Sequence, residues 1–190
     1  MQSGDKRLRY AEIVSGNIIF ATGVEMRIFP NMCGYLSYKR AYENGTPYFL
    51  AYFGDKAIGI TGLYCEERLG EENTVWLGWY GVLPEYRGQG FGKQILLDSI
   101  AEAKKRKFDT FRLYTSVKNC AEACKLYDKV MDIGEDYTLE EPEMLRRVYS
   151  KSLTDKKVIP WNNRYLYLTE NHGEEETALS VYKRRMNEKD

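Results

Sequence analysis

The spacing of apolar residues divides the first half of the chain into short strands and helices. Alternation of apolar and polar residues, or a short β-branched and aromatic run, is typical of a strand, whereas apolar residues three and four apart are typical of a helix. Pro30 ends one helix, and the turn Gly54-Asp55-Lys56 joins two strands as a hairpin. The predicted elements are a strand over residues 9–14, helices over 17–28 and 33–43, and strands over 48–53 and 57–64.

The clearest pattern lies in the middle of the chain. An apolar, aromatic run over residues 75–82 predicts a central strand. A longer segment then carries apolar residues three and four apart, with polar residues on the opposite face, and it ends in the basic cluster 104–107. This predicts an amphipathic helix whose apolar positions are Phe91, Ile95, Leu96, Ile100 and Ala103.

The second half of the chain continues the alternation of strands and helices. Pro142 suits the first position of a helix, and a charged tail from residue 174 suits a solvated helix. The predicted elements are a strand over 110–117, a helix over 120–130, a strand over 134–139, a helix over 143–149 and a strand over 164–169. Hairpins followed by crossover helices predict a mixed α/β domain.

Length and charge bound the class of protein. With 190 residues, the chain is expected to form one domain over residues 1–190. Its 28 basic and 28 acidic residues leave no net charge, which gives no reason to expect a nucleic acid or an anionic membrane as partner. Neither a signal peptide nor a membrane span is predicted, so we expect a cytoplasmic protein, monomeric or homodimeric.

Cysteine and histidine usage gives no sign of a metal site. The four cysteines form no C-x-x-C pair, and His172 is the one histidine. The cysteines are Cys33, Cys65, Cys120 and Cys124. We expect free thiols and no bound metal.

A glycine-rich turn separates the central strand from the amphipathic helix. Gly88, Gly90 and Gly92 stand at every second position and permit a sharp turn with positive φ. The first N–H groups of the next helix have no intrahelical partner, so this turn predicts a site for a phosphate or pyrophosphate. A Walker A loop would need glycine at Arg87 and serine or threonine at Gln94, and a Rossmann loop would need G-x-G-x-x-G with an acidic residue about 20 positions later. Both fail, although a plain flexible turn remains an alternative.

The same segment resembles the coenzyme A pyrophosphate loop of the GNAT superfamily of N-acetyltransferases. Arg87-x-x-Gly90-x-Gly92 follows a strand that ends in Val82-x-Pro84, and the order of elements also resembles that family. The resemblance covers residues 8–170 and implies a mixed, mostly antiparallel sheet whose fourth and fifth strands splay apart, flanked by helices. Residues 171–190 would be a C-terminal helical extension.

The resemblance also implies which residues contact acetyl-CoA and which act in catalysis. Tyr127, in the helix after the fifth strand, would protonate the departing thiolate, since a phenol stays protonated at neutral pH. The central strand holds no carboxylate, so Glu72 at its mouth is the tentative base, with Tyr80 as an alternative. The expected coenzyme contacts are Val82, Leu83, Arg87, Gly88, Gln89, Gly90, Phe91, Gly92, Lys93 and Asn119.

The sequence says less about the substrate that accepts the acetyl group than about acetyl-CoA, which donates it. An acidic loop and many aromatic residues in the first half of the chain would suit a cationic amine. The resulting hypothesis is transfer of an acetyl group from acetyl-CoA to the amine of a small molecule or amino-acid-like substrate. A non-catalytic acyl-CoA-binding module and an acetyltransferase acting on protein N-termini or lysines are the alternatives.

Overall fold

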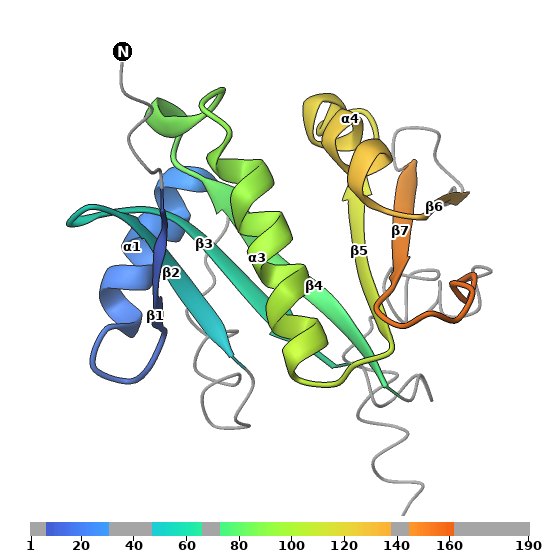
Figure 1. Cartoon of the computed structure of the whole chain (residues 1–190). Coiled ribbons are helices and arrows are strands. Elements are labelled where there is room, and N and C mark those ends of the chain that lie inside the picture. The colour runs from blue at the N-terminus through green and yellow to red at the C-terminus, as the bar shows by residue number, and fades with distance from the viewer. Residues whose placement is uncertain (1–6, 31–46, 66–72, 138–144, 162–190) are drawn as a thin grey trace, which may run out of the picture.

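One seven-stranded sheet forms the centre of the protein. The computed structural model describes residues 7–30, 47–65, 73–137 and 145–161. Within them the strand order is β1-β2-β3-β4-β5-β7-β6, with β4 and β5 parallel and the other neighbours antiparallel (Figure 1). The strands are β1 (Arg9–Glu12), β2 (Tyr48–Phe53), β3 (Lys56–Tyr64), β4 (Thr74–Val82), β5 (Thr110–Ser116), β6 (Ile133–Tyr137) and β7 (Arg146–Ser152). The helices are α1 (Ile18–Ile28), the 3₁₀ turn η2 (Pro84–Tyr86), α3 (Phe91–Lys105) and α4 (Ala121–Val130).

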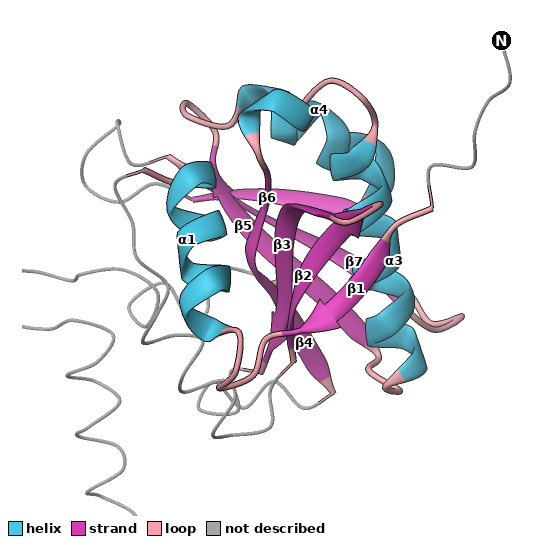
Figure 2. Cartoon of the chain, turned by 90° about the vertical axis from the view of Figure 1, so that its left-hand side faces the viewer, coloured by secondary structure: helices cyan, strands magenta, loops and turns pink. Residues whose placement is uncertain are grey.

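Helices cover both faces of this sheet. Figures 1 and 2 show α1 on one face and α3 on the other. On the α3 face, Leu96 of α3 and Tyr127 of α4 pack in one core with residues of β4 and β5. On the α1 face, Val24 and Ile28 pack against β2 and β3. The predicted strands before α3, and the helices α1, α3 and α4, are confirmed to within a few residues.

The parallel strands β4 and β5 separate after a short contact. They pair from Thr74 and Thr110 to Trp76 and Arg112, and the rest of the two strands has no mutual pairing. Figure 1 shows them diverging toward the end of β4 that leads into α3. The splay that the family resemblance implied is therefore confirmed.

Strand β4 also carries a β-bulge. Ile60 pairs with Gly81 and Gly62 with Gly78, so the single residue between them on β3 faces both Trp79 and Tyr80. Trp79 accommodates the extra residue with a φ of 48°. The bulge puts the Trp79 side chain on the α1 face and Tyr80 on the α3 face.

One predicted element is wrong, and three others cannot be compared. Residues 146–149, expected at the end of a helix, begin strand β7, which pairs with both β5 and β6. Proline at the first position and helix-favouring neighbours suggested a helix, but burial of Val148 and Tyr149 between two strands outweighs that weak propensity. The predicted helix 33–43, strand 164–169 and extension 171–190 lie outside the described residues.

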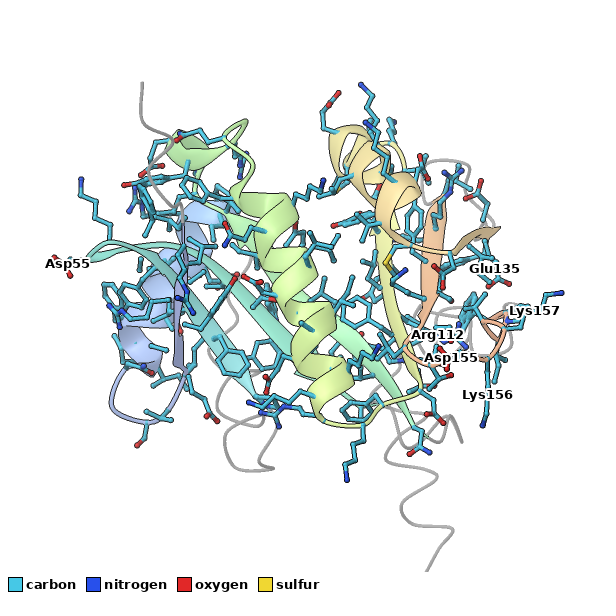
Figure 3. All side chains as sticks on the ribbon, viewed as in Figure 1. Asp55, Arg112, Glu135, Asp155, Lys156 and Lys157 are labelled. Atoms are coloured by element: carbon cyan, nitrogen blue, oxygen red, sulfur yellow. The ribbon has the colours of Figure 1, made fainter. Side chains whose placement is uncertain are left out.

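The chain after β7 closes the far end of the sheet. Arg112 on β5 donates hydrogen bonds to the Ser150 hydroxyl and, at 3.1 Å, to the carbonyl of Ile159. The backbone N–H of Trp161 donates to the Glu135 carboxylate at 2.6 Å, and the Trp161 ring is fully buried. Figure 3 shows Arg112 and Glu135 at this side of the molecule.

None of the helices in the described ranges is both long and apolar enough to cross a membrane.

Two Gly→Ala variants should change stability in opposite directions. A Cβ on Gly62 would overlap the ring of Tyr48, which has no room to move in the core, so we expect a loss of about 1–3 kcal/mol. A Cβ on Gly23, in the exposed face of α1, meets nothing, so we expect a gain of about 0.5–1 kcal/mol. Denaturant unfolding of both variants measures the difference, and equal effects would contradict the packing described for Tyr48.

Candidate active site

A cleft of about 1140 Å³ opens where β4 and β5 diverge. Its walls come from the end of α1, from β4, from β5 and from the first turns of α4. The residues that line it are Ile28, Phe29, Tyr48, Tyr64, Cys65, Leu77, Gly78, Trp79, Tyr80, Gly81, Val82, Arg87, Leu113, Tyr114, Thr115, Lys118, Asn119, Cys120, Ala121, Glu122, Ala123 and Tyr127. A cleft of this size is large enough for a substantial ligand.

The glycine-rich turn lies directly after β4. Leu83 donates its N–H to the carbonyl of Ile58 at 2.8 Å, so the strand remains anchored until the turn begins. Gly88 and Gly90 have φ values of 71° and 89°, and Gly90 is the N-cap of α3. The N–H of Gln94 bonds to Gly90, so the N–H groups of the three residues before it have no partner within the helix.

The electrostatics of this helix start favour an anion. The first turn of α3 holds no acidic residue, and it includes Lys93. The helix dipole adds positive potential at the same place. The predicted anion site therefore has the backbone geometry and the charge that such a ligand needs.

Arg87 connects the turn to α1. Its Nε donates to the carbonyl of Val82 at 3.0 Å, and a terminal nitrogen donates to the carbonyl of Ile28 at 3.4 Å. An exposed ion pair of 2.5 Å between Arg27 and Glu85 joins the same two segments. Arg87 thus stands at the edge of the cleft with its guanidinium held by backbone oxygens.

Two tyrosines meet at the inner end of the cleft. Tyr127 is 5% exposed, and its ring centroid lies 6.3 Å from that of Tyr80. Burial, and then the neighbouring Tyr80, raises the pKa of Tyr127 well above its usual value. No hydrogen bond joins the Tyr127 hydroxyl to any other described residue. The hydroxyl is therefore protonated and available to a ligand.

Tyr80 does not suit the role of base. Its hydroxyl donates a hydrogen bond of 2.6 Å to the carbonyl of Gly92, and burial raises its pKa above the ordinary value. A phenol that is protonated and already donating its proton cannot readily accept another. The contact instead joins β4 to the first turn of α3 beside the anion site.

The start of α4 forms part of the cleft wall. Cys120 is its N-cap, and the Cys120 side chain makes no capping hydrogen bond. Asn119 is exposed and also lines the cleft. Cys120 and Tyr127 are seven residues apart, which is two turns, so they share a face of α4.

The α1 side of the cleft is aromatic. Trp79 packs edge-on against Phe29 with ring centroids 6.1 Å apart. Gly78 lets the Tyr48 hydroxyl approach, since an added Cβ would lie 2.5 Å from that oxygen. A Cβ on Gly81 would overlap Ile28 in the same way. The aromatic residues of the first half of the chain indicated such a surface in general, but the bulge that turns the Trp79 ring to this side has no sequence signature.

The predicted site residues are brought together only in part. Val82, Arg87, Asn119 and Tyr127 line the cleft. A second group forms the adjoining turn and helix start: Leu83, Gly88, Gln89, Gly90, Phe91, Gly92 and Lys93. Glu72 lies outside the described residues, so its role as base stays a prediction.

Carboxylates are scarce in the described cleft. Among the lining residues Glu122 alone carries one, and it is exposed and paired with Lys125 at 2.6 Å. Glu25 is fully buried on α1 but does not line the cleft. Within the part of the chain that the structure describes, no three His, Cys, Asp or Glu side chains gather where they could hold a metal ion.

Comparison with known families gives one match. The model of the acetyltransferase (GNAT) family matches residues 24–132, more than half of the chain. The matched region runs from α1 through β4, the glycine-rich turn, α3 and β5 to the end of α4. Among curated protein sequences, none is similar enough to the chain to count as a match.

Solved structures share the fold at low sequence identity. The ribosomal-protein-S18-alanine N-acetyltransferase from Escherichia coli is 16% identical, with a TM-score of 0.63 over 80% of this chain and 97% of that one. A GNAT family acetyltransferase from Elizabethkingia anophelis with acetyl-CoA bound is 16% identical, with a TM-score of 0.57 over 78% and 99%. A spermidine N-acetyltransferase chimera from Vibrio cholerae and hSSAT is 14% identical, with a TM-score of 0.60 over 77% and 95%.

Proposed function

The chain belongs to the GNAT family of acetyltransferases, and we propose that it moves the acetyl group of acetyl-CoA to the amine of a small molecule or amino-acid-like substrate by direct attack. The observation that carries this proposal is the cleft between β4 and β5. An anion site adjoins it at the start of α3, and within it lies the hydroxyl of the buried Tyr127, which has no hydrogen-bond partner among the described residues. Acetyl-CoA needs both, a site for its pyrophosphate and a proton donor for its sulfur.

Acetyl-CoA would lie along the open edge of β4. Beyond Trp76 this edge no longer pairs with β5, so backbone N–H and C=O groups face the cleft. The two amides of the pantetheine arm can hydrogen-bond to such an edge as an added strand does, near Gly81, Val82 and Leu83. The pyrophosphate would then meet the N–H groups from Gly88 to Lys93, with Arg87 and Asn119 at the margins of the arm.

The chemistry that we propose transfers one acetyl group and two protons. The amine nitrogen attacks the thioester carbonyl, and a backbone N–H of Val82 or a near neighbour holds the oxyanion. The carbon–sulfur bond breaks, and Tyr127 donates its proton to the departing thiolate. Glu72, directly or through water, takes the proton that the amine loses.

The acceptor would lie on the α1 side, against Trp79. The similar folds include enzymes named for a ribosomal-protein alanine and for spermidine, so the fold alone leaves the acceptor open. In this chain the described surface beside the reacting end is formed by Phe29, Trp79 and Tyr64. Aromatic faces bind cationic or planar groups, which supports an amine carried on such a group.

Thiol release tests the proposal directly. Purified protein would be incubated with acetyl-CoA and a panel of polyamines, aminoglycosides, amino acid amides and peptides with free N-termini. Turnover with at least one small amine supports the proposal, whereas turnover only with peptides supports the protein-modifying alternative. Acetyl-CoA binding without any turnover across the panel would favour the non-catalytic module.

Replacing Trp79 should weaken acceptor binding alone. Trp79→Asn removes the ring but tolerates the left-handed backbone, so we expect the KM for the acceptor to rise about 3- to 30-fold. The Kd for acetyl-CoA should stay within about twofold, because the ring faces the α1 side. Phe20→Asn, on the exposed face of α1, is the matched control and should change neither constant. An unchanged KM in Trp79→Asn would remove the ring from the acceptor site.

A further inference from the structure

Cys120 occupies a position that the proposed reaction does not use. It lines the cleft, it is a free cysteine with partial exposure, and it is the N-cap of α4. Residues preferred at an N-cap use a side-chain oxygen to bond the first turn, yet Cys120 makes no such bond. Its sulfur is therefore not used to cap the helix, and the residue forms part of the cleft wall.

A second residue connects this thiol to the reacting end of the cleft. Tyr127 lies on the same face of α4, is 95% buried and holds a hydroxyl with no partner among the described residues. Its side chain leans toward the start of α4, as helical side chains do. Burial is the main cause of the raised pKa of Tyr127, and the neighbouring Tyr80 and Cys120 add to it. If Tyr127 protonates the coenzyme sulfur, the arm that carries this sulfur passes along the face of α4 that presents Cys120.

We propose that Cys120 forms a reversible mixed disulfide with coenzyme A that shuts the enzyme down; the inference rests on the proposed function. The reagent is the disulfide of coenzyme A. The Cys120 thiolate attacks one of its sulfurs, the original S–S bond breaks, and a new S–S bond joins Cys120 to one coenzyme. The second coenzyme leaves as a thiolate and takes a proton, which balances the proton that Cys120 lost. The tethered coenzyme then fills the cleft that acetyl-CoA needs.

The other described cysteines differ from Cys120 in ways that make the reaction selective. Cys124 is 6% exposed and does not line the cleft. Cys65 is exposed but stands at the end of β3, on the acceptor side. The nucleotide part of the reagent would be held by the turn before α3, which raises the local concentration of its disulfide beside α4 and not beside β3.

Intact-mass measurement of the full chain tests the inference. After incubation with coenzyme A disulfide, we expect one coenzyme per chain, located on Cys120 by peptide mapping, together with loss of acetyltransferase activity. A thiol reductant should restore both. Acetyl-CoA should protect the thiol, and glutathione disulfide, which lacks the nucleotide, should react about tenfold more slowly.

Matched serine variants separate the cysteines. Cys120→Ser should stay unmodified, while Cys33→Ser, Cys65→Ser and Cys124→Ser should react as the wild type does. Modification that persists in Cys120→Ser, equal rates with glutathione disulfide, or no protection by acetyl-CoA would each overturn the inference. Thermal shift with acetyl-CoA keeps the two proposals apart. A shift without any adduct refutes only the disulfide, whereas no shift refutes the proposed function as well.

Discussion

Replacing Tyr127 with phenylalanine is expected to lower kcat by about two orders of magnitude while leaving the Kd for acetyl-CoA nearly unchanged. General acids of this kind contribute about 10²- to 10⁴-fold to a rate. The tyrosine ring is buried against Tyr80 and Tyr149, and its hydroxyl has no partner among the described residues, so phenylalanine keeps the packing and breaks no hydrogen bond within them. Steady-state kinetics with acetyl-CoA and a reactive amine gives kcat, and calorimetric titration gives the Kd for acetyl-CoA.

The pH dependence of this effect follows from the raised pKa of Tyr127. An acid is competent while protonated, and burial moves the pH at which Tyr127 loses its proton above the usual value of about 10. The ratio of wild-type to variant kcat should therefore be constant from about pH 6 to 9, since the ionisation of the amine and of the base cancels in it. A ratio that falls toward one within this range would exclude Tyr127 as the acid.

Tyr149→Phe is the control for this experiment. Its ring lies 5.3 Å from that of Tyr127, and its hydroxyl donates a hydrogen bond of 2.8 Å to Asp128. Loss of that bond should cost about 1 kcal/mol of unfolding free energy and change kcat by less than about threefold. Equal losses of kcat in both variants would mean that packing, and not proton donation, determines the rate.

The sequence was sufficient for features that depend on local patterns. The period of α3, the hairpin at Gly54 and the glycine spacing before α3 each follow from a few neighbouring residues, and the structure agrees with them. The helix expected over 143–149 failed because its helix propensity is weak and because pairing with both β5 and β6 is a non-local interaction. No pattern within that segment indicates which strands it will pair with.

The candidate site shows the same limit at finer scale. Tyr127 could be named from the family resemblance, whereas the bulge at Trp79 depends on how β4 aligns with β3, which is decided across two strands. Residues that face the acceptor were therefore the least predictable, and they are also those that would set specificity.

Gly90→Ala should cost at least tenfold in affinity for acetyl-CoA, the second large effect that we expect. Gly90 has a φ of 89°, which alanine adopts only at a cost of about 1–2 kcal/mol. Relief of that strain would shift the start of α3, whose first N–H groups form the proposed pyrophosphate site. Misalignment of even one amide that bonds a charged phosphate costs about 1.5–3 kcal/mol of binding, or about 10- to 150-fold.

Gly54→Ala separates this loss of binding from general destabilisation. Gly54 also has a positive φ, of 59°, and like Gly90 it has open space around its Cα, but it lies in the turn between β2 and β3 and does not line the cleft. Both variants should therefore unfold at lower denaturant, while only Gly90→Ala should lose acetyl-CoA affinity in calorimetric titration. Because the two substitutions impose a similar backbone cost, a normal Kd in Gly90→Ala would mean that the turn before α3 does not hold the coenzyme.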